Sequence, residues 1–397
     1  MLQDLLDKII RDGSLAIRGP DGRVFSVGND PDPPMIHIHD YATILRIARR
    51  PGLAVGEAYM DGGLTVERGT LYDFLAVATR NLQHVGRRRP WRGRPRNKRD
   101  AARRNVAHHY DLSAGLFRLF LDADRQYSCA YFREPGLDLE AAQRAKKGHL
   151  AAKLAIRPGD RVLDIGSGWG GLALTLAEEH GADVLGVTLS TEQLEEARRR
   201  ACERGLAQRV RFHLADYRDV QGEFDRIVSV GMFEHVGPAH YGAYFAAIAR
   251  LLRRDGVALM HTIGRIDGPS GGNAWIEKYI FPGGTIPALS QIAAAIETSG
   301  LIISDVEVLR LHYAETLKAW RERFAANREK ARALYDERFC RMWEFYLAGA
   351  EAGFREGALV VFQIQMVKDR AALPLTRDYI TDFDRDADHQ SMRYAAE

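Results

Sequence analysis

Short apolar runs alternate with amphipathic stretches along the middle of this chain. The apolar runs have the length of buried strands and cover residues 161–165, 183–188, 209–214, 224–230 and 257–263. Segments with helical periodicity separate most of these runs, near 171–180, 191–204 and 240–253. The alternation predicts an α/β fold with a doubly wound, mostly parallel sheet and right-handed crossovers. Because ligands in such sheets bind beyond the carboxyl ends of the strands, functional residues are expected directly after each strand.

The regular alternation ends after residue 263. Residues 264–300 are rich in glycine and proline, and further strands are predicted at 301–309 and 358–367, which brings the expected sheet to seven strands. Two long helical runs, near 314–330 and 332–352, stand before the last strand. A helical insertion at this place can cover a site and exclude water, so we expect a helical lid at about 264–300 and 312–352.

The first 86 residues predict a separate, small α+β domain. Apolar residues recur at helical spacing within residues 1–11, and glycine-rich turns then separate strand-like runs at 14–17 and 24–27. Residues 40–50 and 70–82 are typical of helices. An amphipathic stripe packs in a core more often than on a membrane, so this region by itself indicates no function. The expected organisation is an accessory domain at 1–86, a basic linker at 87–104 and a main domain at 105–397.

The composition adds little to this picture except in one segment. The 397 residues are 46% hydrophobic and 27% charged, which is ordinary for a globular protein with room for two cores. No apolar run reaches the roughly 20 residues of a membrane-spanning helix, and the N-terminus lacks the layout of a signal peptide. Three cysteines without paired spacing argue against a disulfide framework or a zinc cluster, and they favour a reducing cytoplasm.

Residues 87–104 hold ten Lys and Arg against the single acid Asp100. A solvated linker explains this run, because proline, glycine and like charges oppose compact structure. The alternative is a patch for polyanions, either nucleic acid or an anionic membrane surface; the linker is favoured, and the two interpretations are compatible.

The most informative stretch follows the first strand of the expected sheet, where Asp164, Gly166 and Gly168 form the pattern D-x-G-x-G. Glycine lets backbone approach a ligand closely, and a carboxylate beside the turn suits a cation rather than a phosphate. The amino group and sulfonium of S-adenosylmethionine have that character. The alternative is a purely structural strand–turn–helix of another α/β fold.

Polar residues follow the next three strands as well. Thr188, Leu189, Ser190 and Gln193 follow the second strand, where many nucleotide folds have an acid for the ribose, and Asp216 with Tyr217 follows the third. This Asp-Tyr pair can bind and cover an adenine ring, or it can be an ordinary surface turn. The fourth strand leads into Glu234-His235. No further His or Cys stands at ligand spacing, so a proton-accepting glutamate is favoured over a metal site.

Taken together, these residues resemble the cyclopropane-fatty-acyl-phospholipid synthase family, which includes the mycolic acid methyltransferases. The resemblance covers roughly residues 105–370 and rests on the joint order of several motifs: His108-His109-Tyr110-Asp111, Tyr127-Ser128-Cys129-Ala130-Tyr131-Phe132, the glycine-rich turn, Gly186-Val187-Thr188-Leu189-Ser190, Phe233-Glu234-His235, His261-Thr262-Ile263, Lys278-Tyr279-Ile280-Phe281-Pro282-Gly283-Gly284, and His312-Tyr313 followed by Thr316-Leu317 and Trp320. The segment Asp111-Leu112-Ser113-Ala114-Gly115 departs from the usual Gly-Asn-Asp, which puts one local contact in doubt.

The resemblance implies a Rossmann-like class I methyltransferase in which S-adenosylmethionine methylates a cis double bond of a phospholipid acyl chain. It adds Tyr127 and Ser128 to the cofactor-binding residues named above. It also implies a bound bicarbonate that takes the proton lost on ring closure, at positions corresponding to Cys129, Glu234, His261, Tyr313 and the backbone of Ile263. In isolation Cys129, His261 and Tyr313 would be interpreted as core packing, whereas together with Glu234 they favour an anion site with donors and one carboxylate.

Other functions stay open on the sequence alone. A lipid C-methyltransferase of the same fold would stop at a methyl-branched or methylene acyl chain, a non-enzymatic lipid- or nucleic-acid-binding protein would not need the cofactor motifs, and a small-molecule methyltransferase is a third alternative. We expect a cytoplasmic enzyme that binds no nucleic acid and associates peripherally with the inner membrane surface. Residues 87–104 and the apolar helix at 1–11 would contact anionic head groups. A homodimer is left open.

Overall fold

A computed structural model of the chain describes residues 7, 9–82 and 114–383. The basic segment 87–104, most of the apolar helix at 1–11 and the His108-His109-Tyr110-Asp111 motif lie outside the described residues. None of the described helices is both long and apolar enough to cross a membrane.

The larger part of the molecule is built on a seven-stranded sheet with the order β10-β11-β9-β8-β5-β6-β7. Its strands in chain order are β5 (Arg161–Ile165), β6 (Asp183–Thr188), β7 (Val210–Leu214), β8 (Phe224–Val230), β9 (Leu252–Arg265), β10 (Ile302–Leu309) and β11 (Leu359–Val367). Strands β5 to β9 pair in parallel, and β11 pairs antiparallel with both β9 and β10. The expected mostly parallel seven-stranded sheet is therefore confirmed.

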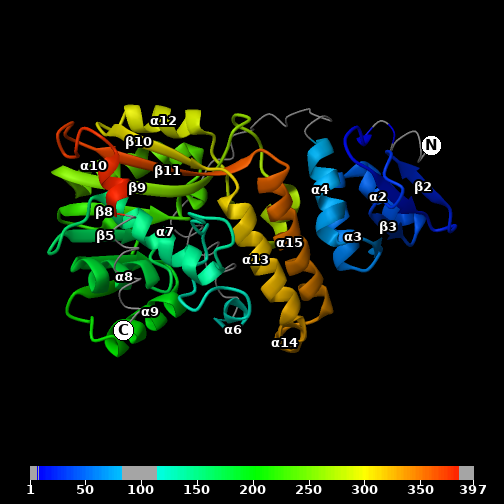
Figure 1. Cartoon of the computed structure of the whole chain (residues 1–397), viewed down its shortest axis with the longest axis horizontal. Helices are drawn as coiled ribbons and strands as arrows, with labels where there is room; N and C mark the ends of the chain where they lie inside the picture. Colours follow the sequence, from blue (N-terminus) through cyan, green and yellow to red (C-terminus); the bar gives the residue numbers. More distant parts are fainter. Residues whose placement is uncertain (1–6, 8, 83–113, 384–397) are drawn as a thin grey trace.

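Helices cover both faces of this sheet, as the doubly wound fold requires. Apolar side chains of α7 (Leu139–Leu154), α8 (Gly171–His180) and α9 (Thr191–Glu203) pack on one face against Val162, Val184 and Val228. The other face carries α10 (Tyr241–Leu251) and α12 (Leu289–Glu297), which pack against Leu163, Ile227 and Met260. Figure 1 shows the two layers above and below the green strands.

Helix boundaries in the insertion before the last strand differ from the expected ones. The two predicted runs form three helices, α13 (His312–Ala326), α14 (Arg328–Leu334) and α15 (Glu337–Arg355). The chain breaks at Asn327, whose side-chain amide donates to the carbonyl oxygens of Leu119 and Arg323 (both 3.0 Å). Asp336 then caps α15 by accepting the N–H of Phe339 (2.6 Å). Side chains that cap backbone groups thus set the boundaries, and hydrophobic periodicity does not report them.

The segment 264–300 splits between two places in the molecule. Helix α12 lies on the sheet beside α10, whereas α11 (Ala274–Tyr279) packs against α3 (Pro51–Met60) near the other end of the molecule. A lid over 264–300 and 312–352 stays a prediction.

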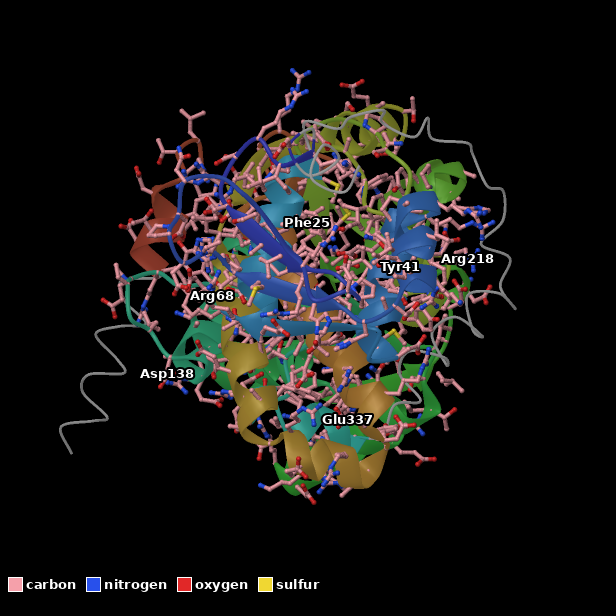
Figure 2. All side chains as sticks on the ribbon, turned by 90° about the vertical axis from the view of Figure 1, so that its right-hand side faces the viewer. Phe25, Tyr41, Arg68, Asp138, Arg218 and Glu337 are labelled. Atoms are coloured by element: carbon pink, nitrogen blue, oxygen red, sulfur yellow. The ribbon has the colours of Figure 1, made fainter. Side chains whose placement is uncertain are left out.

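Residues 9–82 form a second sheet with its own helices. Its strand order is β2-β1-β3-β4, from β1 (Leu15–Arg18), β2 (Val24–Val27), β3 (Met35–Ile38) and β4 (Leu64–Arg68). Helices α2 (Tyr41–Arg49), α3 and α4 (Leu71–Leu82) accompany it, and α3 and α4 pack against α15. Figure 2 views the molecule from this side, with Phe25, Tyr41 and Arg68 labelled. This arrangement confirms the expected small α+β unit at the N-terminus.

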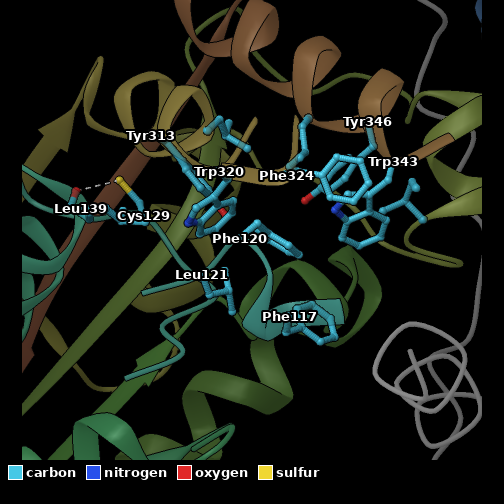
Figure 3. Packing of buried hydrophobic residues seen from close by; sticks show 14 of the residues in the cluster. Phe117, Phe120, Leu121, Cys129, Leu139, Tyr313, Trp320, Phe324, Trp343 and Tyr346 are labelled. Carbon is cyan, nitrogen blue, oxygen red and sulfur yellow. Dashed lines mark hydrogen bonds between the residues drawn. The ribbon is translucent and has the colours of Figure 1, made fainter. Parts of the chain in front are cut away.

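An aromatic cluster fills the space between α6 (Ala114–Arg118) and the helices α13 and α15 (Figure 3). We use this name for eight side chains in mutual ring contact: Phe117, Phe120, Tyr127, Trp169, Trp320, Phe324, Trp343 and Tyr346. Phe120 makes ring contacts with five of the other members. Trp320 is fully buried, and Tyr127 stacks on it at 5.2 Å between ring centroids. The cluster places a large apolar volume beside the carboxyl ends of the strands, because Trp169 belongs to the glycine-rich turn.

Candidate active site

The glycine-rich turn leaves β5 in a conformation that side chains disfavour. Gly166 and Gly168 have φ of 84° and 54°, in the left-handed region where glycine carries no steric cost. The N–H groups of Gly166 and Ser167 donate to the carbonyl oxygen of Val187 at 2.9 and 3.0 Å, which ties the turn to the end of β6. The turn thus holds backbone at the carboxyl edge of the sheet, where ligands of doubly wound folds bind.

A cavity of about 160 Å³ opens at this edge. Ten of the residues expected to bind a cofactor line it: Tyr127, Ser128, Asp164, Gly166, Gly168, Thr188, Leu189, Gln193, Asp216 and Tyr217. Ser190 does not. Its hydroxyl caps α9 by accepting the N–H of Gln193 (3.3 Å), so this serine supports the cavity wall from behind.

The ends of β6 and β7 bring hydroxyl, amide and carboxylate groups to one side of the cavity. The hydroxyl of Thr188 donates to Oε1 of Gln193 (2.9 Å), which fixes the amide of that glutamine. Asp216 accepts from the guanidinium of Arg218 (2.8 Å), and the same guanidinium lies 5.7 Å from the centre of the Tyr217 ring. Burial raises the pKa of Tyr217 to about 12, so the ring stays a neutral, flat surface at physiological pH.

Asp164 lies deeper, at the end of β5. Its Oδ2 atom is buried without a hydrogen-bond partner, and burial raises the pKa of this carboxyl to about 7. A carboxylate in this state gains most from a cation that enters the cavity, because the cation replaces the water lost on folding.

The residues expected to be catalytic do not line this cavity. They lie beside it, in two groups. Glu234 follows β8, and its Oε1 accepts the backbone N–H of Ile263 on β9 (2.6 Å). Its Oε2 is buried without a partner, and burial raises the pKa of the carboxyl to about 7. The Ile263 N–H is therefore engaged by Glu234, and the free carboxylate oxygen is the acceptor that this group offers.

His261 stands two residues before Ile263 on the same face of β9. Its Nδ1 lies 3.2 Å from Nε2 of Gln363, and because the glutamine amide donates, Nδ1 accepts and Nε2 carries the imidazole proton. Burial and the nearby Lys146 hold the pKa of His261 well below its usual range. His261 is thus a neutral hydrogen-bond donor.

Cys129 and Tyr313 form the second group, next to the aromatic cluster (Figure 3). The backbone N–H of Ala130 donates to the hydroxyl of Thr316 (3.0 Å), which holds the Cys129 segment against the first turns of α13. The Cys129 thiol donates to the Ala130 carbonyl oxygen (3.2 Å), and burial raises its pKa, so it is neither a nucleophile nor a metal ligand. The Tyr313 ring packs on Phe354 at 4.8 Å.

The cavity also has walls that the sequence analysis did not assign to the site, formed by Arg125, Gln126, Trp169, Met232, His235 and Val236. Gln126 stands directly before the Tyr127-Ser128 motif, Trp169 stands within the glycine-rich turn and His235 follows Glu234. Adjacency to the motif residues was the available signal. Burial lowers the pKa of His235 to about 4, so it faces the cavity as a neutral imidazole.

Comparisons with known proteins agree with this geometry. The profile of the family described as mycolic acid cyclopropane synthetase matches residues 97–364. A cyclopropane-fatty-acyl-phospholipid synthase of Escherichia coli is 40% identical over 352 residues, 85% of this chain and 88% of that protein. A tuberculostearic acid methyltransferase of Mycobacterium tuberculosis is 40% identical over 365 residues (86% and 84%), and a probable fatty acid methyltransferase of Pseudomonas putida is 39% identical over 372 (90% and 94%).

Solved structures show the same fold. A cyclopropane synthase from Mycobacterium tuberculosis superposes with a TM-score of 0.64 at 34% identity, covering 66% of this chain and 97% of that one. A mycolic acid cyclopropane synthase solved in complex with SAH and CTAB gives a TM-score of 0.64 at 35% identity, with the same coverage.

Proposed function

The chain belongs to the mycolic acid cyclopropane synthetase family of S-adenosylmethionine-dependent methyltransferases that act on lipid acyl chains, and on this premise we propose its reaction. It adds the methyl carbon of S-adenosylmethionine to the cis double bond of an unsaturated phospholipid acyl chain and closes a cyclopropane ring. Its relatives are named for different lipid products. Closure of the cyclopropane ring is therefore part of our proposal and does not follow from the family alone.

One observation carries the proposal: a polar cavity suited to a nucleoside meets an apolar aromatic cluster. Tyr127 and Trp169 line the cavity and also belong to the aromatic cluster, so the two regions share a wall. Glu234 and His261 are both buried, next to His235 and Val230 of the cavity lining. This arrangement suits a reaction between a charged methyl donor and an uncharged alkene, because the alkene needs apolar surroundings and the donor needs polar ones.

The chemistry requires alignment and then a base. The alkene is a weak nucleophile, so the sulfonium must be held in line with it in a site without water. As the new C–C bond forms, the C–S bond breaks and S-adenosylhomocysteine leaves, with a positive charge on the other alkene carbon. A C–H bond of the added methyl then breaks, its electron pair closes the ring, and the proton passes to a base.

We place a bicarbonate among Glu234, His261, Tyr313 and Cys129 as that base; when bound, it supplies the oxygen that takes the methyl proton. The residues fit such a group. The partnerless Oε2 of Glu234 is an acceptor for the hydroxyl of the anion, and the Nε2–H of His261 is a donor for its charged oxygens. The N–H of Ile263 orients Glu234 for this role. The Cys129 thiol, protonated at all physiological pH values, can serve as a weak donor to the anion when its S–H turns away from the Ala130 carbonyl oxygen.

Radiolabel transfer tests the reaction. The purified chain, incubated with methyl-labelled S-adenosylmethionine and vesicles of a dioleoyl phospholipid, is expected to label the lipid and to raise the mass of an acyl chain by CH₂ with loss of its double bond. A labelled acyl chain that keeps a double bond, or that is saturated and heavier by CH₂ plus two hydrogens, would favour the second candidate, a methylene or methyl-branched acyl chain. The similarity to a tuberculostearic acid methyltransferase supports that candidate. Label in small amines and none in lipid would contradict both.

We also propose that the enzyme works at the cytoplasmic side of the inner membrane, bound peripherally to anionic phospholipid. The ten Lys and Arg of residues 87–104 support this, since each contributes ~1 kcal/mol near such a surface. Replacing the arginines of 87–99 by serine is expected to abolish flotation with phosphatidylglycerol vesicles at low salt and to leave S-adenosylhomocysteine binding unchanged. Unaltered flotation would contradict the electrostatic role. A homodimer stays a proposal for sedimentation to test.

A further inference from the structure

Helix α7 buries a lysine that none of the steps above uses. Lys146 is fully buried, and its Nζ donates to Oε1 of Gln126 (2.6 Å) and to Oγ of Ser128 (2.9 Å). One turn earlier, Nε2 of Gln143 donates to the backbone carbonyl oxygens of Gln126 (3.3 Å) and Ser128 (3.0 Å). Since Gln126 and Ser128 line the cofactor cavity, these two side chains of α7 hold one of its walls from behind.

The charge of Lys146 decides which way its partners donate. An ammonium has only donors, so the Ser128 oxygen must accept from it, and the hydroxyl proton of Ser128 is left to point elsewhere. The same constraint acts on Gln126, whose Oε1 accepts from Lys146 while its Nε2 donates to Oδ2 of Asp124 (2.9 Å). Ser128 lines the cavity, and its proton is therefore available to an acceptor on a bound ligand.

The amino-acid end of the methyl donor carries such an acceptor. Its ammonium and sulfonium match the partnerless carboxylate oxygen of Asp164, and its carboxylate needs donors and a positive charge. We propose that Lys146 is a positioning residue that fixes Ser128 as a hydrogen-bond donor to the carboxylate of S-adenosylmethionine. The inference rests on the methyl-donor site and is independent of which lipid product is formed.

The surroundings of Lys146 keep it charged near neutral pH. Burial lowers its pKa to about 8, against the opposing effect of two acids in the loop before Ser128. The charged and titratable groups that act on it come from four elements: Asp122, Asp124 and Cys129 in that loop, Lys147 on its own helix, Asp164 on β5 and His261 on β9. In mild alkali the neutral amine of Lys146 can accept a hydrogen bond as well as donate one. The Ser128 hydroxyl can then donate to Lys146, and its proton is no longer directed to the ligand.

The affinities of two nucleosides distinguish a positioning role of Lys146 toward the ligand carboxylate from a role in holding the whole cavity wall in place. S-adenosylhomocysteine has the amino-acid carboxylate, and 5′-methylthioadenosine lacks it. In calorimetric titrations we expect Lys146→Met to weaken S-adenosylhomocysteine by roughly tenfold to a hundredfold, which is the usual effect of losing a hydrogen bond to a charged group. 5′-Methylthioadenosine is expected to change by less than about twofold. Ser128→Ala should give the same pattern, and the double variant should be no weaker than either single one.

Lys153→Met is the matched control. Lys153 lies two turns further along α7, is equally buried, and pairs with Glu307 (2.5 Å) on β10 and not with the cavity wall. Its loss is expected to lower the melting temperature and to leave the affinity of both nucleosides unchanged.

The pH profile of the unaltered protein gives a second measurement, which decides the matter even if Lys146→Met fails to fold. Affinity for S-adenosylhomocysteine should fall between pH 7.5 and 9 with a midpoint near 8, while that of 5′-methylthioadenosine stays flat. Since the amino group of the ligand titrates in alkali too, Ser128→Ala is the reference curve. Equal losses of both nucleosides, additive effects of Lys146→Met and Ser128→Ala, or a profile identical to that of Ser128→Ala would overturn the inference. A protein that passes these tests and yet alkylates no lipid would refute the proposed function alone.

Discussion

The cofactor cavity and the aromatic cluster share a wall but differ in how they are made. Many polar residues of the cavity lie at the end of a strand or within a few positions after it, as Asp164 does within β5 and Asp216 after β7, whereas Arg125 to Ser128 come from the loop before α7. The aromatic cluster instead draws on residues from Phe117 to Tyr346, which only the folded chain brings together. The cavity therefore depends on local turns, and the cluster depends on the packing of α6, α13 and α15.

This difference separates affinity from chemistry. In the proposed reaction the cavity would offer hydrogen bonds and charge to the nucleoside, and the cluster would exclude water from the alkene. Glu234 and His261 are both buried, and neither of them lines the cavity. A change on one side should therefore alter binding of the donor, and a change beside the wall should alter turnover.

The largest expected effect follows from Glu234→Gln. A glutamine keeps the size of the side chain but loses the carboxylate acceptor, so we expect kcat for ring formation to fall by roughly 10²–10⁴. Affinity for S-adenosylhomocysteine should change by less than about twofold, because Glu234 does not line the cavity. Steady-state kinetics and calorimetry measure the two. Glu223→Gln, at an exposed position, is the control. A variant that closes the ring at the normal rate would remove Glu234 from the mechanism.

Stability should respond mainly to the aromatic cluster. Trp320→Ala deletes a fully buried indole and is expected to cost ~3–5 kcal/mol in guanidinium unfolding. Gly168→Ala adds a methyl group where no atom lies within 4 Å, so the cost of its positive φ, ~1 kcal/mol, is all that we expect. Equal destabilisation by the two substitutions would contradict the claim that the aromatic cluster is tightly packed and the glycine-rich turn is open.

A smaller effect concerns the pH dependence of donor binding. Because the pKa of Asp164 is raised to about 7, this carboxyl is protonated in the ligand-free protein at acidic pH and must ionise to receive a cation. Affinity for S-adenosylmethionine should therefore rise between pH 6 and 8, with proton release on binding. Calorimetry in buffers of different ionisation enthalpy measures that release.

Asp164→Asn should flatten this rise and weaken binding by roughly tenfold, the scale of a lost charge-assisted hydrogen bond. The same raised pKa predicts that the ligand-free protein loses stability as pH increases from about 4 to 7, and that the ligand restores it. An Asp164→Asn variant that keeps the full pH dependence would show that another group titrates.

The sequence predicts the cofactor cavity better than it predicts the aromatic cluster. Strands β5, β6 and β8 begin and end at the expected residues, because buried runs in a parallel sheet are continuously apolar. The residues that follow these strands line the cavity, because ligands of doubly wound sheets bind beyond the carboxyl ends of the strands. Ser190 was expected there and instead caps α9, since a serine before a helix serves equally well as ligand or cap.

What the sequence did not show depends on contacts between distant residues. Lys146 has the pattern of a solvated helix residue, and only the approach of α7 to the loop at 126–128 buries it. The break at Asn327 and the aromatic cluster have the same origin, in side chains that meet across about 200 residues.

The central claim is that donor and alkene meet at the shared wall and that the added methyl loses one hydrogen on ring closure. The most direct test supplies S-adenosylmethionine with a fully deuterated methyl group to the purified chain and dioleoylphosphatidylglycerol vesicles, and examines the acyl chains by mass spectrometry and proton NMR. We predict chains that carry two of the three deuterium atoms within a saturated cyclopropane ring. Chains that retain all three deuterium atoms, or that keep an olefinic carbon, would contradict the account.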